Sequence, residues 1–170
     1  MKYRAAWLAI GLLVLSAASA HACINWASRR YGVPAELLQA IAQVESSANP
    51  RAFNRNVDGT HDIGLMQINS RWLGKLHQNG LTENDLWDPC VNTLVAAWLL
   101  SENFRIWGPT YRALGAYHSP SPARQIWYAR RVLGVTLKSH PEREAPWTTQ
   151  FCKDLSNECR QSPVPVAGSR

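Results

Sequence analysis

The stretch that decides the fold of this chain reads Pro34-Ala35-Glu36-Leu37-Leu38-Gln39-Ala40-Ile41-Ala42-Gln43-Val44-Glu45-Ser46-Ser47. Pro34 suits the first position of a helix, and the residues behind it are good helix formers. Leu38, Ile41 and Glu45 follow the i, i+3, i+7 spacing, so they share one face of the predicted helix. Burial on this apolar face should raise the pKa of the Glu45 carboxyl and hold its proton near neutral pH. Glu45 is therefore a candidate general acid.

A segment rich in turn-forming residues follows the helix at residues 54–63. It centres on Asp58-Gly59, a pair that favours a two-residue hairpin turn. The run Gly64-Leu65-Met66-Gln67-Ile68-Asn69 comes directly out of it. The sequence therefore predicts a helix that carries the acid beside a small polar β-hairpin.

Several motifs, taken in order along the chain, closely resemble those of lytic transglycosylases. They are Glu45-Ser46, Gly64-Leu65-Met66-Gln67-Ile68, Ala116-Tyr117, and Tyr128 followed by Val132. Lytic transglycosylases have a lysozyme-like fold and cleave the glycan strands of peptidoglycan, and the match covers residues 23–134. Cys23, the triplet Asp88-Pro89-Cys90 and the short chain look most like the small members that accompany secretion, conjugation and pilus machines.

A second resemblance overlaps the first, because residues 54–72 are similar to the hairpin of animal-type lysozymes. Asp62 stands at the position of their second catalytic carboxylate, and its spacing from Glu45 also matches that family. The resemblance implies that Asp62 is a second catalytic residue. The alternative is that Asp62 caps a turn, since aspartate in hairpins often bonds its own backbone.

The family resemblance also implies a set of residues that contact the substrate: Ser46, Gly64, Met66, Gln67, Tyr117, His118 and Tyr128. Gly64 would let the backbone approach a sugar closely, and Tyr128 would form a hydrogen bond near Glu45. His118 stands where the family usually has Asn, and a titrating histidine would make the site pH-dependent. The alternatives are helix surface for Ser46, core or strand packing for Met66 and Gln67, and helix core for the two tyrosines.

The two ends of the 170-residue chain differ in composition from its middle. Lys2 and Arg4, an apolar run and then small residues predict a signal peptide over residues 1–22, cleaved after Ala20 or Ala22. The apolar run is short for a membrane span, so no stable membrane anchor is expected. We predict one exported, periplasmic lysozyme-like domain at residues 23–135 and a Pro-rich C-terminal appendage at 136–170.

Four cysteines in an exported chain suggest two disulfides, for which three pairings are possible. We favour Cys23–Cys90, because both residues flank predicted core helices and the family resemblance supports the link. That choice leaves Cys152–Cys159 to close a small C-terminal loop. The five histidines are scattered and no metal-ligand spacing appears, so neither a metal nor a cofactor is predicted.

The full chain has a net charge of +6, and removing Lys2 and Arg4 with the predicted leader leaves 16 − 12 = +4. This charge suits an anionic polymer such as peptidoglycan, and a solvated surface explains it equally well. Basic residues cluster in nothing larger than pairs, such as Arg29-Arg30 and Arg130-Arg131, and form no concentrated stripe of the kind that binds nucleic acid. Nucleic acid is therefore not an expected partner. The family resemblance implies peptidoglycan strands as the substrate and periplasmic components of a secretion, conjugation or pilus machine as further partners.

Capping residues predict where the remaining helices begin and end. Gly32 ends a helix at residues 24–31, Asp88 caps the clearest helix in the chain, and a shorter helix covers residues 110–117. Ser121-Pro122 starts the last helix, which we expect to end at Gly134. The predicted fold class is mainly α (α+β), a lysozyme-like helical domain with a small β-hairpin.

The resemblance implies cleavage of the β-1,4 bond between N-acetylmuramic acid and N-acetylglucosamine. Glu45 would protonate the glycosidic oxygen and then help the muramyl 6-hydroxyl to attack, which gives a 1,6-anhydro end. Asp62 would stabilise the developing oxocarbenium charge or position the sugar. One alternative is a hydrolytic lysozyme that uses Glu45 and Asp62 as a carboxylate pair. Another is a non-catalytic peptidoglycan-binding component of such a machine.

Overall fold

The computed structural model describes residues 23–139 and Phe151. Residues 23–31 are helical, and the elements that follow are α2 (Ala35–Ser46), β1 (Phe53–Arg55), β2 (His61–Ile63), β3 (Ile68–Asn69), the 3₁₀ helix η1 (Ser70–Trp72), α3 (Leu73–His77), the 3₁₀ helix η2 (Asn84–Trp87), α4 (Pro89–Trp107), α5 (Tyr111–His118) and α6 (Pro122–Ser139). The mainly α fold with a small sheet is confirmed. The predicted signal peptide, most of the predicted appendage and the Cys152–Cys159 link lie outside the described residues.

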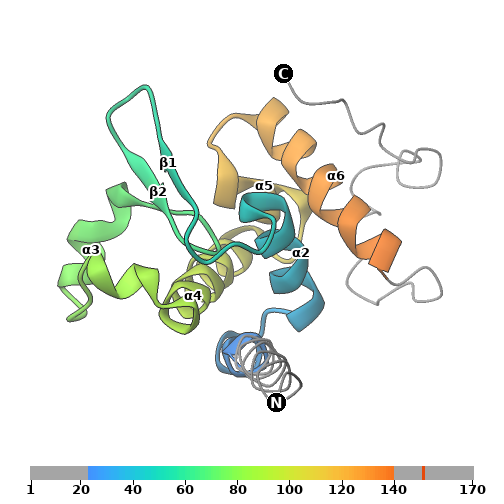
Figure 1. Ribbon diagram of the computed structural model, residues 1–170. Coiled ribbons are helices and arrows are strands. Elements are labelled where there is room, and N and C mark those ends of the chain that lie inside the picture. The colour runs from blue at the N-terminus through green and yellow to red at the C-terminus, as the bar shows by residue number, and fades with distance from the viewer. Residues whose placement is uncertain (1–22, 140–150, 152–170) are drawn as a thin grey trace, which may run out of the picture.

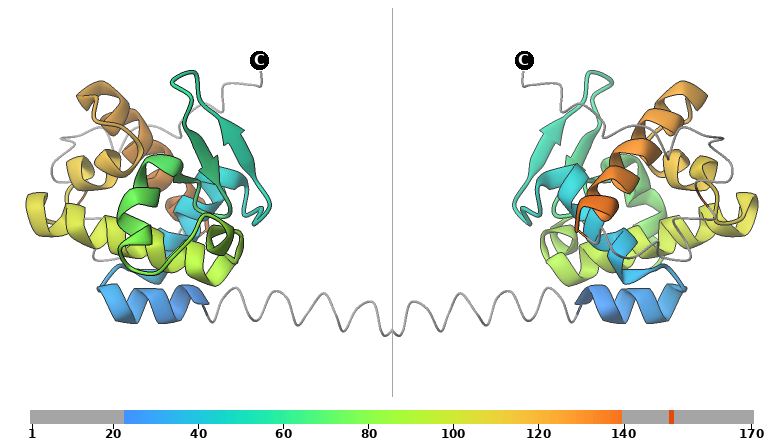
Figure 2. Two further views of the ribbon diagram at one scale, coloured as in Figure 1. Left: turned by 90° about the vertical axis from the view of Figure 1, so that its left-hand side faces the viewer. Right: turned by 90° about the vertical axis from the view of Figure 1, so that its right-hand side faces the viewer.

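Helix α2 lies between the strands and the last two helices (Figure 1). It packs against α6, which packs on α5, and α5 packs in turn on α4. The helix at residues 23–31 lies at the end of the domain away from the hairpin, as both views in Figure 2 show. This arrangement places the C-terminal end of α2 between β2 and α6.

The core is built around the apolar face of α2. Leu38 and Ile41 are completely buried there, as the helical spacing predicts, and Leu37 fills the neighbouring position. Met66 from the loop after β2 and Tyr128 from α6 belong to the same cluster. Glu45 continues this face into the last turn of α2, so the protein core surrounds the carboxyl on one side.

The hairpin differs from the sequence prediction in two ways. Arg55 pairs with His61, so residues 56–60 form a five-residue loop and the predicted two-residue turn at Asp58-Gly59 is wrong. The Asp58 side chain accepts hydrogen bonds from the N–H and the hydroxyl of Thr60, which gives the loop its own turn. A third strand, β3, pairs with β2, and this two-residue strand was not predicted.

The start of α4 confirms two predictions. Asp88 Oδ1 accepts hydrogen bonds from the N–H groups of Cys90 and Val91, at 2.7 and 3.1 Å, with Pro89 at the first helical position. Cys23 is disulfide-bonded to Cys90, which is the pairing that the sequence favours. The disulfide joins the helix at residues 23–31 to the first turn of α4.

Helix α6 is longer than predicted. It continues past Gly134 to Ser139, so the predicted end of the helix is wrong. Thr136 is buried in this last part, and its hydroxyl bonds the carbonyl of Val132. The predicted domain boundary after residue 135 therefore falls inside α6. Phe151, which we assigned to the appendage, is buried and packs edge-on against Phe104.

No helix within residues 23–139 has both the length and the apolar content that crossing a membrane requires. Over the same part of the chain, no three His, Cys, Asp or Glu residues gather in a group that could hold a metal ion.

Candidate active site

Glu45 lies in the last turn of α2, where it meets α6. The hydroxyl of Tyr128 donates a hydrogen bond of 2.6 Å to Glu45 Oε1, as the sequence resemblance led us to expect. Burial raises the pKa of the Glu45 carboxyl to about 7, and the negative charge of Asp62 adds to the increase, while the Tyr128 hydrogen bond and Arg131 oppose it. The protonated and ionised forms of Glu45 are thus both populated near neutral pH.

Two stacked tyrosines form the wall beside Glu45. The rings of Tyr117 and Tyr128 lie 6.5 Å apart, and the Tyr117 hydroxyl donates a 2.7 Å hydrogen bond to the Met66 carbonyl. Burial is the main cause that raises the pKa of both phenols. Both hydroxyls therefore keep their protons and act as fixed donors, one toward Glu45 and the other toward the loop after β2.

Ser46 connects the end of α2 to the same loop. Its hydroxyl donates to the carbonyl of Leu65 at 2.7 Å, and its oxygen accepts the N–H of Asn49 at 3.1 Å. The side chain is partly buried, so it is not simply helix surface. Ser46 fixes the position of the residue beside it, which is Glu45.

The loop after β2 rests on a buried asparagine that the sequence analysis did not single out. Asn92 of α4 is completely buried, accepts the N–H of Met66 at 2.7 Å, and donates to the carbonyls of Ile63 and Leu86, both at 2.9 Å. Gly64 has a φ of +77°, and a Cβ there would lie 2.6 Å from Asn92 Nδ2 and 2.8 Å from the Leu86 carbonyl oxygen. The close approach expected at Gly64 is thus made to Asn92 and Leu86.

Met66 and Gln67 complete this loop. The Met66 side chain is completely buried, whereas its backbone carbonyl accepts the Tyr117 hydroxyl. Gln67 adopts a φ of +50°, unusual for a residue other than glycine, and its amide donates to the carbonyls of Gly64 and Ala52 at 2.9 and 3.2 Å. Both residues hold the loop in one shape beneath Tyr117.

Asp62 lies in the middle of β2, and three asparagine side chains surround it. Asn69 donates to Oδ1 at 2.7 Å, while Asn56 and Asn54 donate to Oδ2 at 3.0 and 3.4 Å. Amide N–H groups suit an ionised carboxylate, which can only accept hydrogen bonds. The turn-capping role in this hairpin belongs instead to Asp58.

His118 ends α5 and covers Tyr128. The two rings are parallel, with an interplanar angle of 2° and centroids 4.7 Å apart. Burial lowers the pKa of the imidazole below 6.5, and the positive charge of Arg124 lowers it further. His118 is therefore mainly neutral at neutral pH and stacks as an uncharged ring.

Replacing His118 by asparagine tests this placement. We expect His118→Asn to retain most of the activity at pH 7.5, because the imidazole is already neutral there. Differences in rate should appear only below about pH 6.5, where an ordinary histidine gains its proton. Rates measured between pH 5 and 8 check this, and a difference that is largest at pH 8 would contradict it.

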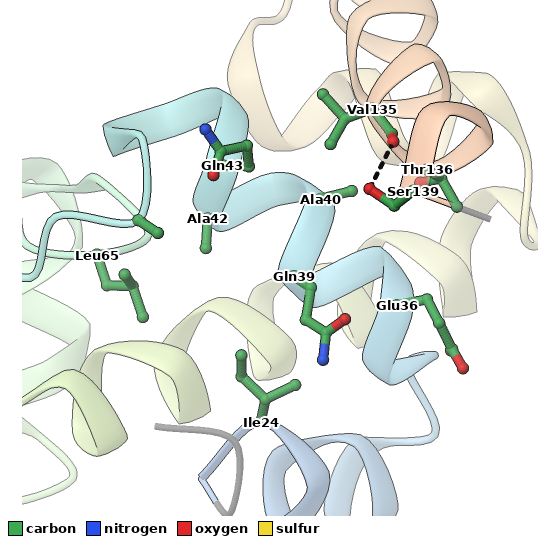
Figure 3. A pocket seen from close by; sticks show the side chains of 11 residues that line it. Ile24, Glu36, Gln39, Ala40, Ala42, Gln43, Leu65, Val135, Thr136 and Ser139 are labelled. Carbon is green, nitrogen blue, oxygen red and sulfur yellow. Dashed lines mark hydrogen bonds between the residues drawn. The ribbon is translucent and has the colours of Figure 1, made fainter. Parts of the chain in front are cut away.

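A separate hollow lies on another face of α2 (Figure 3). Glu36, Gln39 and Gln43 line it from α2, and Val135 and Thr136 line it from α6. Neither of the two candidate catalytic carboxylates is among its lining residues. The hollow is therefore not part of the site around Glu45.

A comparison with protein families identifies the class to which this fold and site belong. Residues 22–131 match the family described as the transglycosylase SLT domain, which is more than half of the chain. The chain belongs to this family and is by class a lytic transglycosylase, an enzyme that acts on peptidoglycan.

Individual relatives cover most of the chain. "Invasion protein IagB" of Salmonella typhimurium (strain SL1344) is 41% identical over 148 residues, which span 80% of this chain and 92% of the relative. "Protein IpgF" of Shigella flexneri is 40% identical over 126 residues, spanning 69% of this chain and 83% of the relative. An Escherichia coli protein named "X polypeptide" is 34% identical over 144 residues, spanning 79% and 85%.

Proposed function

We propose that this enzyme cleaves the β-1,4 bond between N-acetylmuramic acid and N-acetylglucosamine and leaves a 1,6-anhydromuramic acid end. The observation that carries the proposal is the Glu45 carboxyl, whose pKa of about 7 lies near a neutral working pH. General acid–base catalysis is most efficient when the pKa of the catalytic group is close to the operating pH. Such a group can give up a proton and take one back within a single turnover.

In the first step, protonated Glu45 donates its proton to the glycosidic oxygen as the bond to the muramyl C1 breaks. N-acetylglucosamine leaves with a free 4-hydroxyl, and positive charge develops at C1. Asp62 provides the negative charge that stabilises this oxocarbenium-like state, held by its three asparagine donors.

In the second step, the ionised Glu45 takes the proton of the muramyl 6-hydroxyl, and the oxygen of that hydroxyl attacks C1. The new bond closes the 1,6-anhydro ring, and Glu45 regains the proton it lost. The Tyr128 hydroxyl keeps Oε1 in place through both steps. The cycle consumes no water and returns the enzyme to its starting state.

The remaining predicted substrate residues act in this proposal around the loop after β2. Ser46, Met66 and Tyr117 fix the loop through the hydrogen bonds described above, and Gln67 and Gly64 shape it. Sugar contacts at Ser46, Gln67 and His118 are part of the proposal, because these side chains are not fully buried.

We further propose that the enzyme is exported to the periplasm and opens the wall locally for a secretion, conjugation or pilus apparatus. The support is the leader-like sequence at residues 1–22 and the similarity to a protein named for invasion. In this proposal residues 23–135 form the catalytic domain, and residues 136–170 form an appendage at its C-terminal end.

The ends of the products test the reaction directly. Purified peptidoglycan is digested with the full chain, and the released fragments are analysed by mass spectrometry before and after borohydride reduction. Anhydro ends, which resist reduction, are the expected result. Free reducing ends would instead support the hydrolytic lysozyme that pairs Glu45 with Asp62, the alternative favoured by the three donors on Asp62. Binding without turnover would leave only a non-catalytic role.

Replacing Asp62 by asparagine should reduce the rate by about 10- to 100-fold, because a charge that stabilises the transition state is lost. It should also move the fall of activity at high pH to a lower pH. The reason is that Asp62 helps to raise the pKa of Glu45, so its removal lets Glu45 ionise sooner. The measurement is a pH–rate profile of each protein.

The matched control for this substitution is Asp58→Asn, which changes an exposed carboxyl on the same hairpin. We expect its rate and its pH profile to follow those of the unaltered enzyme. An Asp62→Asn enzyme with full activity and an unshifted profile would remove Asp62 from the mechanism and leave Glu45 as the sole catalytic carboxyl.

A further inference from the structure

An exposed aromatic residue with basic neighbours marks the outer face of α6. Arg124, Trp127 and Arg131 follow the i, i+3, i+7 spacing that places side chains on one face of a helix. Trp127 is 53% exposed, and the guanidinium carbon of Arg131 lies 5.5 Å from the centre of its ring. We call these three residues the α6 stripe.

The α6 stripe has no part in the core. The buried residues of this helix are Gln125, Tyr128, Ala129, Val132, Leu133 and Thr136. None of the ion pairs found among the described residues includes Arg124 or Arg131. Within the described part of the chain, the stripe therefore presents positive charge to solvent with no acid in salt-bridge contact, next to an aromatic surface.

The stripe begins where the candidate active site ends. The ring of Trp127 lies 5.9 Å from that of His118, and His118 stacks on Tyr128, which bonds Glu45. The positive charge of Arg131 acts on Glu45 as well as on His118. When a substrate is bound at Glu45, the groups next to its scissile bond thus lie close to the α6 stripe.

We propose that the α6 stripe binds the acidic stem peptide of a muramic acid residue adjacent to the scissile bond. This inference rests on the proposed function, because it takes peptidoglycan as the substrate of Glu45. In intact strands the sugars are uncharged, because the lactyl carboxyl of muramic acid is amide-bonded to the stem peptide, whereas the stem peptides carry carboxylates. Guanidinium groups bind carboxylates through paired hydrogen bonds, and an indole ring gives the peptide an apolar surface to lie on.

The consequence is a preference for glycan strands that still carry their peptides. Rates at low substrate concentration are compared on intact strands and on the same strands after an amidase has removed the peptides, which replaces the carboxylates of each peptide by the single lactyl carboxylate of muramic acid. We expect the full-length enzyme to be about fivefold faster on the intact strands, as befits a few partly exposed charge pairs. Arg124→Gln/Arg131→Gln and Trp127→Ala should each bring this ratio close to one.

The matched control is Arg112→Gln on α5. Arg112 also lies over a tryptophan, 5.4 Å from the ring centre of Trp107, and its charge is not among those that act on Glu45 or His118. This variant should keep both rates and their ratio. The ratio is the readout, because the loss of Arg131 also changes the surroundings of Glu45 and alters both rates together.

Three results would overturn the inference. In the first, the unaltered enzyme acts at the same rate on intact and on peptide-free strands. In the second, the rate of the double arginine variant falls by the same factor on both kinds of strand. In the third result, Trp127→Ala would slow both reactions equally, which would make Trp127 a sugar-binding residue. Equilibrium binding of both strands to the Glu45→Gln protein gives the same ratio without turnover. A failure of the proposed reaction, seen in the product ends, is thereby distinguished from a failure of peptide binding.

Discussion

Replacing Glu45 by glutamine is expected to reduce the turnover of peptidoglycan by a factor of about 10³–10⁴, the upper part of the range for general acid–base catalysis. Glutamine keeps the shape of the side chain and can still accept the hydrogen bond of Tyr128, but it can neither donate nor recover the catalytic proton. Both proposed steps use this one carboxyl, so both are lost together. The release of soluble fragments from purified peptidoglycan measures the effect.

The free energy of unfolding of the Glu45→Gln protein provides a control for this experiment. A carboxyl whose pKa is raised by folding contributes stability that is fully present below the unfolded pKa of about 4.5, and this stability is lost as the pH rises through 7. Glutamine does not ionise, so Glu45→Gln should match the unaltered protein at pH 4 and exceed its free energy of unfolding by about 1–3 kcal/mol at pH 8. Denaturant unfolding at the two pH values measures this difference.

An inactive variant that is also unstable at both pH values would show that the loss of activity comes from misfolding. An active Glu45→Gln enzyme would overturn the proposed mechanism, since no other residue is assigned the proton transfers.

Replacing Asn92 by leucine is expected to destabilise the folded protein by about 3–5 kcal/mol. Leucine has a similar size but leaves the N–H of Met66 and the carbonyls of Ile63 and Leu86 without their buried partner. Each unsatisfied buried group costs about 1–3 kcal/mol. The melting temperature should fall by about 10 °C or more. Activity measured well below that temperature should fall too, because the displaced loop carries the acceptors of Ser46 and Tyr117.

Thr93→Val is the matched control for this substitution. Thr93 is equally buried on α4, but its hydroxyl bonds only the Pro89 carbonyl in its own helix. We expect it to cost less than about 1.5 kcal/mol, the value of one ordinary hydrogen bond. If both variants lose similar stability, the three contacts of Asn92 are not what holds the loop.

The sequence was sufficient to predict the features that depend on local chemistry or on the family motifs. The helix that carries Glu45, the Asp88 cap and the Cys23–Cys90 link were all predicted correctly. Each of them rests on residue spacing, on capping preferences or on the family motifs. The predicted end of the last helix failed because Gly134 resembles a helix terminator, whereas the buried Thr136 extends the packing beyond it.

The hydrogen bonds that hold the candidate active site in place could not be predicted in this way. Asn92 lies in an apolar helical pattern, where a single asparagine looks like an ordinary polar position. Its acceptor and donor contacts come from Ile63, Met66 and Leu86, two of which are more than twenty residues away in sequence. The donors around Asp62 depend likewise on the five-residue loop and on β3, which brings Asn69 opposite Asp62. Such contacts appear only once the chain has folded.

The disulfide between Cys23 and Cys90 gives the enzyme a dependence on its redox surroundings. The bond encloses a segment of the chain that includes α2 and the sheet, and closing a loop of this length is worth roughly 4 kcal/mol in the chain-entropy model. A reducing cytoplasm withholds that contribution, and an oxidising compartment supplies it. Under the proposed export to the periplasm, a newly made chain would thus gain its full resistance to unfolding only after leaving the cytoplasm. Oxidation would then act as a maturation step for an enzyme that acts on peptidoglycan.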